Sequence, residues 1–287
     1  MTWLRLFGKK QAAAPEPEAS EGRRFGSERE RMFDLPHTQV LAELFAVPRD
    51  RRDADWSERF WDSAWWGSIA LTEPQVFAGP DGFPYLRLDL PRPDTPFDSQ
   101  CLGNLAGGCL ANGVGAAFFA SPDDPAEAAQ YVLPLGLLDS LLRYDSPDGD
   151  PIDIAEAAEP ADEAAFDVET GRWSQTLTTR EAHEVLIGTP SAEFLPPPIA
   201  AALGRHLERE WGLADPRVQL VVDPHMRPHR SLVVGRKRSE FRAEEPADDM
   251  ARALLWYLTP RRSVMLMPEE WSLGEMTPLR DLAQAAL

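Results

Sequence analysis

The C-terminal half of the chain is organised by the stretch Val218-Gln-Leu-Val-Val-Asp-Pro-His-Met-Arg-Pro-His-Arg-Ser-Leu-Val-Val-Gly235. Its two apolar runs, 218–222 and 230–235, are rich in valine and leucine, and a segment with two prolines separates them. This pattern is typical of two strands joined by a turn. Upstream, 196–211 opens with prolines, carries apolar residues at helical spacing and stops at Gly212, which predicts a helix.

The flanking segments extend this pattern to a complete small domain. A short apolar run at 184–188 predicts a strand before the helix, and 263–267 predicts a strand at the end. Between them, 246–258 places Met250 and Leu254 on one helical face. The predicted order is β-α-β-β-α-β, which is the order of a ferredoxin-like unit, in a chain of the α+β class. A C-terminal extension, 269–287, follows with one short helix from Thr277.

Three segments in this half resemble the C-terminal domain of the SseB (enhanced serine sensitivity) family, over about residues 180–268. They are His183-Glu-Val-Leu-Ile-Gly-Thr-Pro-Ser191, Val218-Gln-Leu-Val-Val222 and Pro228-His-Arg-Ser-Leu-Val-Val-Gly235. The family pattern is a strand ending in Gly-x-Pro, a helix, and a His-x-x-Leu-x-x-Gly strand. The resemblance implies a fold in a bacterial-type protein and supplies no catalytic residues, and the acidic connector and the tryptophan cluster depart from it.

The N-terminal half predicts a second mixed α and β domain. Helices are expected at 38–45, at 55–69, from Ser99 to Gly113, and through 137–142. Tyr85-Leu-Arg-Leu-Asp-Leu90 alternates after a Pro-Asp-Gly turn and predicts a hairpin strand, and further strands are expected at 114–120 and 130–133. We therefore divide the chain into a disordered tail (1–30), an N-terminal domain (31–144), an acidic linker (145–172) and a C-terminal domain (173–287).

Charge and composition exclude several classes of protein. The 287 residues carry a formal net charge of -18, which disfavours nonspecific binding to a phosphate backbone, so we expect no nucleic-acid partner. No apolar run approaches the ~20 residues that a membrane span needs. Residues 145–169 hold ten acidic and no basic residues, which predicts an exposed connector. Two cysteines cannot form a dense disulfide framework, and we expect no cofactor.

The N-terminal ten residues have two interpretations. Trp3, Leu4, Leu6 and Phe7 alternate with Arg5, Lys9 and Lys10, as in a weak interfacial anchor. So short a segment buries too little apolar area for stable anchoring, so we favour a frayed terminus. The segment is also too short for a secretory signal, so we expect a cytoplasmic protein without stable membrane insertion.

A cluster of aromatic residues lies within the second predicted helix. Trp56, Trp61, Trp65 and Trp66 recur at helical intervals together with Phe60. Exposed rings of this kind would form a platform for a ligand or partner. Helical spacing more often marks a core face, and this is the interpretation that we favour.

The densest set of potential metal ligands is Asp223, His225 and His229. An aspartate and two histidines can bind zinc when a loop brings them together. However, Arg227 and Arg230 lie within the cluster and would repel a dication, and no recognised His-metal spacing is present. Solvated histidines in a turn are the simpler interpretation.

Other catalytic motifs do not occur in the sequence. Cys101 and Cys109 fall on one predicted helix about 12 Å apart, too far for a disulfide, and are expected to be buried thiols. The glycines near them do not form a phosphate-binding fingerprint, and no Gly-x-Ser-x-Gly motif exists.

A basic run reverses the charge of the chain locally. It contains six cations against one anion, Glu240, and comprises Arg227, Arg230, Arg236, Lys237, Arg238 and Arg242. Arginine forks match carboxylates and phosphates, so the run predicts a site for an anion or an acidic partner. It could equally be a solvated loop, or fold against the acidic connector of the same chain.

We therefore expect a non-catalytic protein-interaction module with an unidentified protein partner. The alternatives are a metal-dependent hydrolase that uses the 223–229 cluster and a peripheral membrane adaptor that uses the N-terminal ten residues. The sequence leaves the oligomeric state open.

Overall fold

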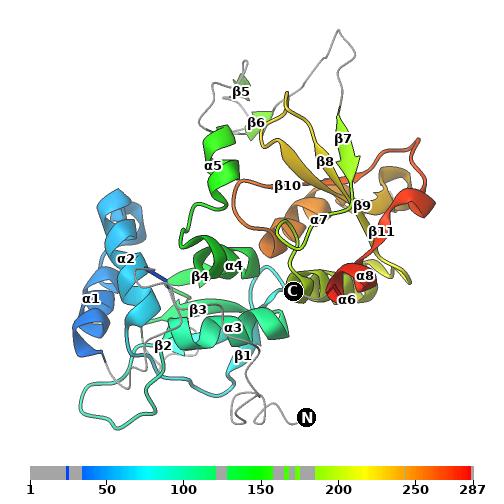
Figure 1. The fold of residues 1–287 in the computed structure, drawn as a ribbon. Helices are drawn as coiled ribbons and strands as arrows, with labels where there is room; N and C mark the ends of the chain where they lie inside the picture. Colours follow the sequence, from blue (N-terminus) through cyan, green and yellow to red (C-terminus); the bar gives the residue numbers. More distant parts are fainter. Residues whose placement is uncertain are drawn as a thin grey trace. The chain divides into compact units, whose positions relative to one another are not determined.

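The chain folds into two compact units, 1–146 and 147–287, in a computed structural model (Figure 1). The structure describes residues 24–25, 34–120, 128–157, 165–167, 172–174, 185–242 and 244–285. Both units combine helices with a mixed sheet, so the chain belongs to the α+β class. Within these ranges, no helix has both the length and the apolar character needed to cross a membrane. The segment Trp3 to Lys10, interpreted as a frayed terminus or alternatively as an interfacial anchor, lies outside the described residues.

In its described residues, the first unit is a four-stranded sheet with four α-helices. Its elements are α1 (Leu35–Phe45), η2 (Arg49–Arg51), α2 (Ala54–Trp66), β1 (Val76–Ala78), β2 (Pro84–Asp89), α3 (Leu102–Asn112), β3 (Gly115–Phe119), β4 (Tyr131–Leu133) and α4 (Leu135–Tyr144). The strand order is β1-β2-β3-β4; β2 and β3 are parallel, and the outer strands are antiparallel to their neighbours. Side chains from all four helices pack into one core with the residues of one sheet face.

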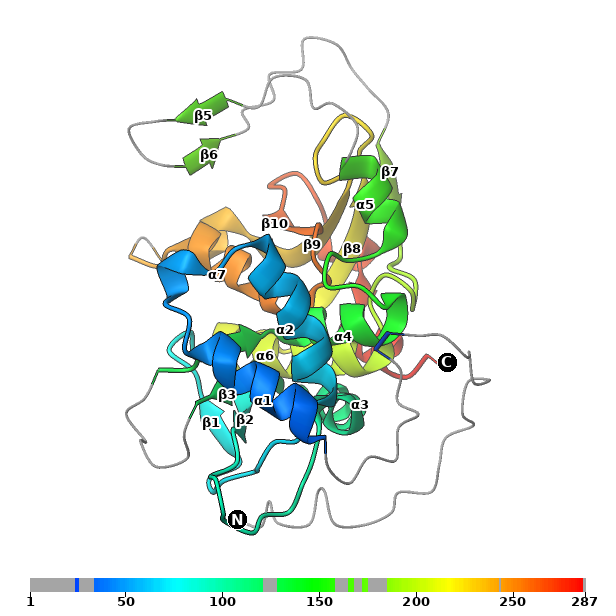
Figure 2. The same cartoon turned by 90° about the vertical axis from the view of Figure 1, so that its left-hand side faces the viewer.

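The helix α2 shows how local sequence builds this core. The Asp53 carboxylate caps it by accepting from the Trp56 backbone N–H at 2.9 Å. Phe60 is fully buried and stacks on Trp56 with the ring centroids 5.0 Å apart. α1 and α2 lie side by side in both views (Figures 1 and 2). The predicted helix at 55–69 is confirmed, with an earlier end at Gly67.

Arg24 and Phe25 correct the prediction of a disordered tail over 1–30. The Phe25 side chain is 1% exposed and packs edge-on against Trp65. The backbone N–H groups of Arg24 and Phe25 both donate to the Asp145 carboxylate, at 2.9 and 2.5 Å. This short segment is therefore part of the first unit, because a buried ring and a shared carboxylate hold it there.

The second unit is built around a sheet of three long strands with two short ones at its edge. Its elements are α5 (Pro151–Ala157), β5 (Ala165–Asp167), β6 (Arg172–Ser174), β7 (Leu186–Gly188), α6 (Pro197–Trp211), β8 (Arg217–Val222), β9 (Arg230–Lys237), η3 (Arg238–Glu240), α7 (Ala247–Ala253), η4 (Leu254–Tyr257), β10 (Ser263–Met267), η5 (Leu273–Glu275), β11 (Thr277–Pro278) and α8 (Leu279–Ala283). The predicted helices and strands from 184 to 267 are confirmed in type and order.

The ferredoxin-like arrangement predicted for this unit is wrong. The sheet runs β10-β9-β8, and β7 and β11 pair with the two ends of β8 on its other side. β9 and β10 are adjacent and parallel, joined through α7 and η4, and β7 is antiparallel to β8. In a split β-α-β unit another strand lies between the parallel pair. Element order alone does not determine which strands become neighbours.

The two units repeat one order of elements. The first runs α2-β1-β2-α3-β3-β4-α4 and the second runs α6-β8-β9-α7-β10-β11-α8. In each, an antiparallel pair is followed by a helical crossover to a parallel strand. They differ in the last strand, because β4 pairs with β3 whereas β11 pairs with β8. Each sheet can therefore be compared strand by strand with the other.

The beginning of the predicted acidic linker is folded into the second unit. Asp150 and Asp153, at and within α5, are 2% and 3% exposed. Arg230 donates to Asp153 at 2.6 Å and to Asp150 at 3.1 Å, and Arg262 donates to the same two carboxylates at 2.9 and 3.1 Å. The prediction of an exposed linker from 145 is thus wrong for its first residues, because arginines distant in the sequence neutralise the carboxylates.

Candidate binding surface

The sheet of the first unit has two chemically different faces. Leu86 and Leu88 of β2 alternate toward the helical core, together with Phe118 of β3. Tyr85 and Arg87 alternate with them and therefore lie on the opposite face. That second face is the floor of a hollow.

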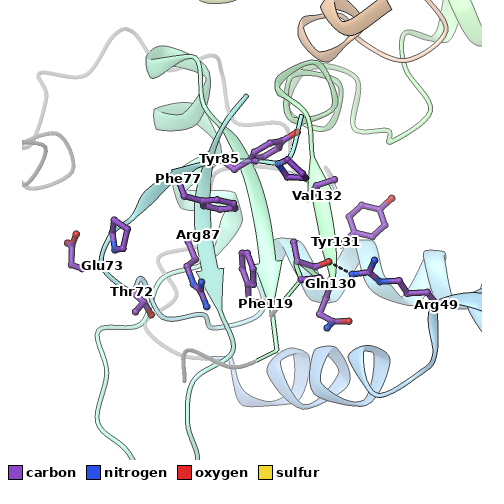
Figure 3. A pocket seen from close by; sticks show the side chains of 15 residues that line it. Arg49, Thr72, Glu73, Phe77, Tyr85, Arg87, Phe119, Gln130, Tyr131 and Val132 are labelled. Carbon is purple, nitrogen blue, oxygen red and sulfur yellow. Dashed lines mark hydrogen bonds between the residues drawn. The ribbon is translucent and has the colours of Figure 1, made fainter. Parts of the chain in front are cut away.

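The hollow has a volume of about 1020 Å³. Three rings from three strands line it: Phe77 of β1, Tyr85 of β2 and Phe119 of β3. Figure 3 shows Phe77, Arg87 and Phe119 projecting beside one another from the sheet. Phe119 meets Phe77 edge-on, with the centroids 5.6 Å apart. We call this hollow the ring pocket; a volume of this size is typical of ligand sites.

Arg87 is held flat against the floor of the ring pocket. Its guanidinium lies 4.1 Å from the centroid of the Phe119 ring. The same group donates to both carboxylate oxygens of Asp89, at 3.0 and 3.1 Å, and Asp89 is fully buried. A buried carboxylate is retained only where it is paired and hydrogen-bonded. The ion pair thus fixes the orientation of Arg87, and its guanidinium covers the face of the Phe119 ring.

Tyr85 is fixed in the same way. Its hydroxyl donates to the Asp81 carboxylate at 2.5 Å. Gly115 on β3 leaves room for the ring, because a Cβ there would lie 2.8 Å from Tyr85 Cδ1 and 2.7 Å from the Leu133 carbonyl oxygen. The two main polar groups of the pocket floor are therefore already engaged within the chain.

Two arginines fasten the segment that leads into β4. Arg49 donates to the Ala129 carbonyl at 2.6 Å, which Figure 3 marks, and Arg52 donates to the Gln130 carbonyl at 2.8 Å. Burial lowers the pKa of Arg52, and the neighbouring Arg49 charge lowers it further. Arg49 lines the ring pocket, where Arg87 and Glu73 are the other charged residues of the described lining. Because Asp89 neutralises Arg87, the charges in and directly beneath the lining balance.

The tryptophan cluster does not form a surface. Trp56, Trp61, Trp65 and Trp66 are 6%, 9%, 1% and 6% exposed and belong to the helical core of the first unit. The possibility of an aromatic platform on α2 is therefore wrong, and the core interpretation favoured from the helical spacing is correct. The reason is that α2 turns its ring-bearing side toward β3 and β4, where Phe60 meets Phe118 and Tyr131.

Asp223, His225 and His229 do not gather into a metal site. Asp223 accepts from the His225 backbone N–H at 2.9 Å, and its own N–H donates to the His229 carbonyl at 2.9 Å. The Arg227 guanidinium contacts the His229 ring. No group of three metal-binding side chains occurs anywhere in the part of the chain that the structure describes. The cluster closes the turn between β8 and β9 through its backbone instead.

The basic run is divided between the two ends of β9. Arg227 and Arg230 lie before or at its start, and Arg236, Lys237, Arg238 and Arg242 lie at or beyond its end. Its members are largely engaged within the chain. Arg236 stacks 3.9 Å from the Phe241 centroid, Lys237 donates to the Glu269 carbonyl at 2.6 Å, and Arg238 pairs with Asp248. The run therefore does not form one continuous patch, and a site for an anion or an acidic partner at either end of β9 stays a prediction.

Sequence reasoning overlooked both the ring pocket and Arg262. The signal for the pocket was present in Tyr85-Leu-Arg-Leu-Asp, where alternation puts a ring, a cation and an anion on one face. Arg262 gave no local signal, because its partners Asp150 and Asp153 are 112 and 109 residues away.

In comparisons with known proteins, no family model, no curated protein and no solved structure matches the chain. The resemblance to the SseB family remains a prediction.

Proposed function

We propose that the chain is a non-catalytic interaction protein and that the ring pocket is its binding surface. The observation that carries this proposal is the floor of the pocket, which is mainly apolar: the half-buried Phe77 ring and the stacked Arg87 guanidinium lie over the almost fully buried rings of Tyr85 and Phe119. Aromatic residues and arginine are the groups that most often dominate binding energy at interfaces.

The chemistry of the floor favours binding over catalysis. Arg87 and Tyr85 are committed to Asp89 and Asp81, so these polar groups orient the surface. A catalytic acid, base or nucleophile needs a reactive group within reach of the substrate. What the floor offers is rigid apolar area, and a preorganised surface costs little ordering on binding.

The resemblance of the second unit to the SseB family is compatible with this function. We propose that the second unit belongs to the SseB family, on the basis of two features. The strand β7 ends at Gly188 directly before Thr-Pro, and α6 and β9 follow it in the order of the family pattern. The resemblance bears on the fold of 180–268 and assigns no activity.

The test is a selection from a random peptide library displayed on phage, with the immobilised full-length chain as bait. Peptides that survive are measured by fluorescence anisotropy against Val132→Glu, which places a charge at the rim of the ring pocket. Val132 is 43% exposed, so the substitution leaves the core intact. The matched control is Leu255→Glu, because Leu255 is 38% exposed and lies in the second unit.

The proposal predicts binding that is about tenfold weaker or more for Val132→Glu, because a bound partner would desolvate the new carboxylate against an apolar surface, and unchanged for Leu255→Glu. The double variant Arg238→Glu/Arg242→Glu tests the basic run instead. Loss of binding in that variant alone would transfer the binding surface to the end of β9. A selection that enriches no peptide would reject the proposed function.

A further inference from the structure

The second sheet carries on its open face a segment of its own chain. Trp271 and Met276, which follow β10, pack with Val233 of β9 and Met267 of β10 in one cluster. Val233 and Met265 are paired neighbours and lie on the same face of the sheet. The opposite face, with Leu232 and Val234, is fully buried.

This segment, 268–276, is held by specific contacts. A Cβ on Gly235 would lie 2.7 Å from Leu273 Cδ2, so the glycine admits the leucine side chain to the sheet. Arg217 donates to the Leu273 and Met276 carbonyls at 3.3 and 3.2 Å. The segment therefore packs on the sheet with the side chains of Trp271, Leu273 and Met276, and hydrogen bonds from Arg217 hold its backbone.

The corresponding place in the first unit is the ring pocket. β1, β2 and β3 correspond to β8, β9 and β10, and the face that carries Phe77, Tyr85 and Phe119 is the one turned away from the helices. The segment after β3, at 121–130, reads Ser-Pro-Asp-Asp-Pro-Ala-Glu-Ala-Ala-Gln. It contains no aromatic side chain and no leucine, isoleucine, valine or methionine. The sequence therefore supplies no counterpart of Trp271 or Met276 at this position.

We propose that the ring pocket binds a peptide segment of a partner protein that carries a tryptophan followed at short spacing by leucine or methionine. This inference rests on the proposed function. The second unit provides the template, because residues 268–276 read Pro-Glu-Glu-Trp-Ser-Leu-Gly-Glu-Met.

The test uses a fluorescein-labelled synthetic peptide with the sequence of 268–276 and the full-length chain, followed by fluorescence anisotropy. Saturable binding is expected. It becomes about tenfold weaker or more with Val132→Glu in the protein or with Trp271→Ala in the peptide, and stays unchanged with Leu255→Glu. Phe77→Ala, which removes a half-buried ring from the pocket wall, provides a second variant should the charged substitution perturb the fold.

Binding that does not saturate, or that is equally strong in Val132→Glu and Phe77→Ala, would overturn the inference. The library selection separates this failure from that of the proposed function. Selected peptides that depend on Val132 but lack a tryptophan and a neighbouring aliphatic residue would reject the inferred ligand and keep the binding surface. A selection without enrichment would reject both.

Discussion

Substituting Arg262 by methionine should destabilise the second unit more than any exposed substitution. The Arg262 side chain is 1% exposed and joins Asp150, Asp153 and the Phe194 carbonyl. Methionine fills similar space but leaves two buried carboxylates with only Arg230 to neutralise them. Breaking a buried ion pair by removing one partner costs about 3–5 kcal/mol. Because Arg230 remains, we expect the lower end, about 3 kcal/mol.

The assay is urea unfolding followed by pulsed hydrogen exchange and mass spectrometry, which reads each unit from its own peptides. At a denaturant slope of about 2 kcal/mol per molar, the midpoint of the β9 and β10 peptides should fall by about 1.5 M. The midpoint of the α2 peptides in the first unit should not move.

The matched control is Arg252→Met. Arg252 pairs with Asp249 at 3.3 Å, but the two side chains are 62% and 63% exposed. An exposed pair contributes about 0–1 kcal/mol, so this variant should stay close to wild type. The reasoning would be refuted if Arg262→Met lost no more stability than Arg252→Met.

Four further predictions follow from the same structure. Trp65→Ala should destabilise the first unit by about 3–5 kcal/mol in the same assay, because the ring is 1% exposed in a close-packed core. Gly115→Ala should cost about 1–3 kcal/mol, since its Cβ would press on Tyr85 and on the Leu133 carbonyl oxygen. In the same assay only the peptides of the first unit should show this loss of stability. Burial raises the pKa of the Cys109 thiol to about 12, so it should react with Ellman's reagent at pH 8 only after unfolding. Burial raises the pKa of Asp150, but the Ile152 N–H and the charges of Arg230 and Arg262 outweigh burial and hold that pKa below 3.8. The ionised Asp150 therefore contributes stability above about pH 4, and this stability is lost as the pH falls below it; an acid titration followed through the β9 and β10 peptides checks this.

The elements that could be predicted from the sequence are those whose signal is local. α6 has its apolar spacing and its terminating Gly212 within one segment, and it was predicted to within a residue of its observed bounds. α2 was likewise marked by its aromatic periodicity. Such helices bury one face of their own pattern, so the pattern is readable without knowing the partner.

The features that could not be predicted depend on distant partners. α5 lies in a stretch of acidic residues without apolar periodicity. Its carboxylates can be buried because Arg230 and Arg262 neutralise them. The same holds for the strand order of the second sheet, where register rather than element order sets Arg262 beside Arg230. The ring pocket occupies an intermediate position, because its residues alternate along β2 but its other rings come from β1 and β3.

The place of α5 also determines where the chain can be cut. Composition alone sets the second domain at 173–287, whereas the compact unit begins at Pro147. A fragment starting at 173 would retain Arg230 and Arg262 and discard the two carboxylates that neutralise them, leaving two guanidinium groups side by side at the starts of neighbouring strands. Like charges in that position repel, and their desolvation is no longer compensated. Expression of the second unit by itself should therefore begin at residue 147, and the shorter fragment should be the one that proteases degrade.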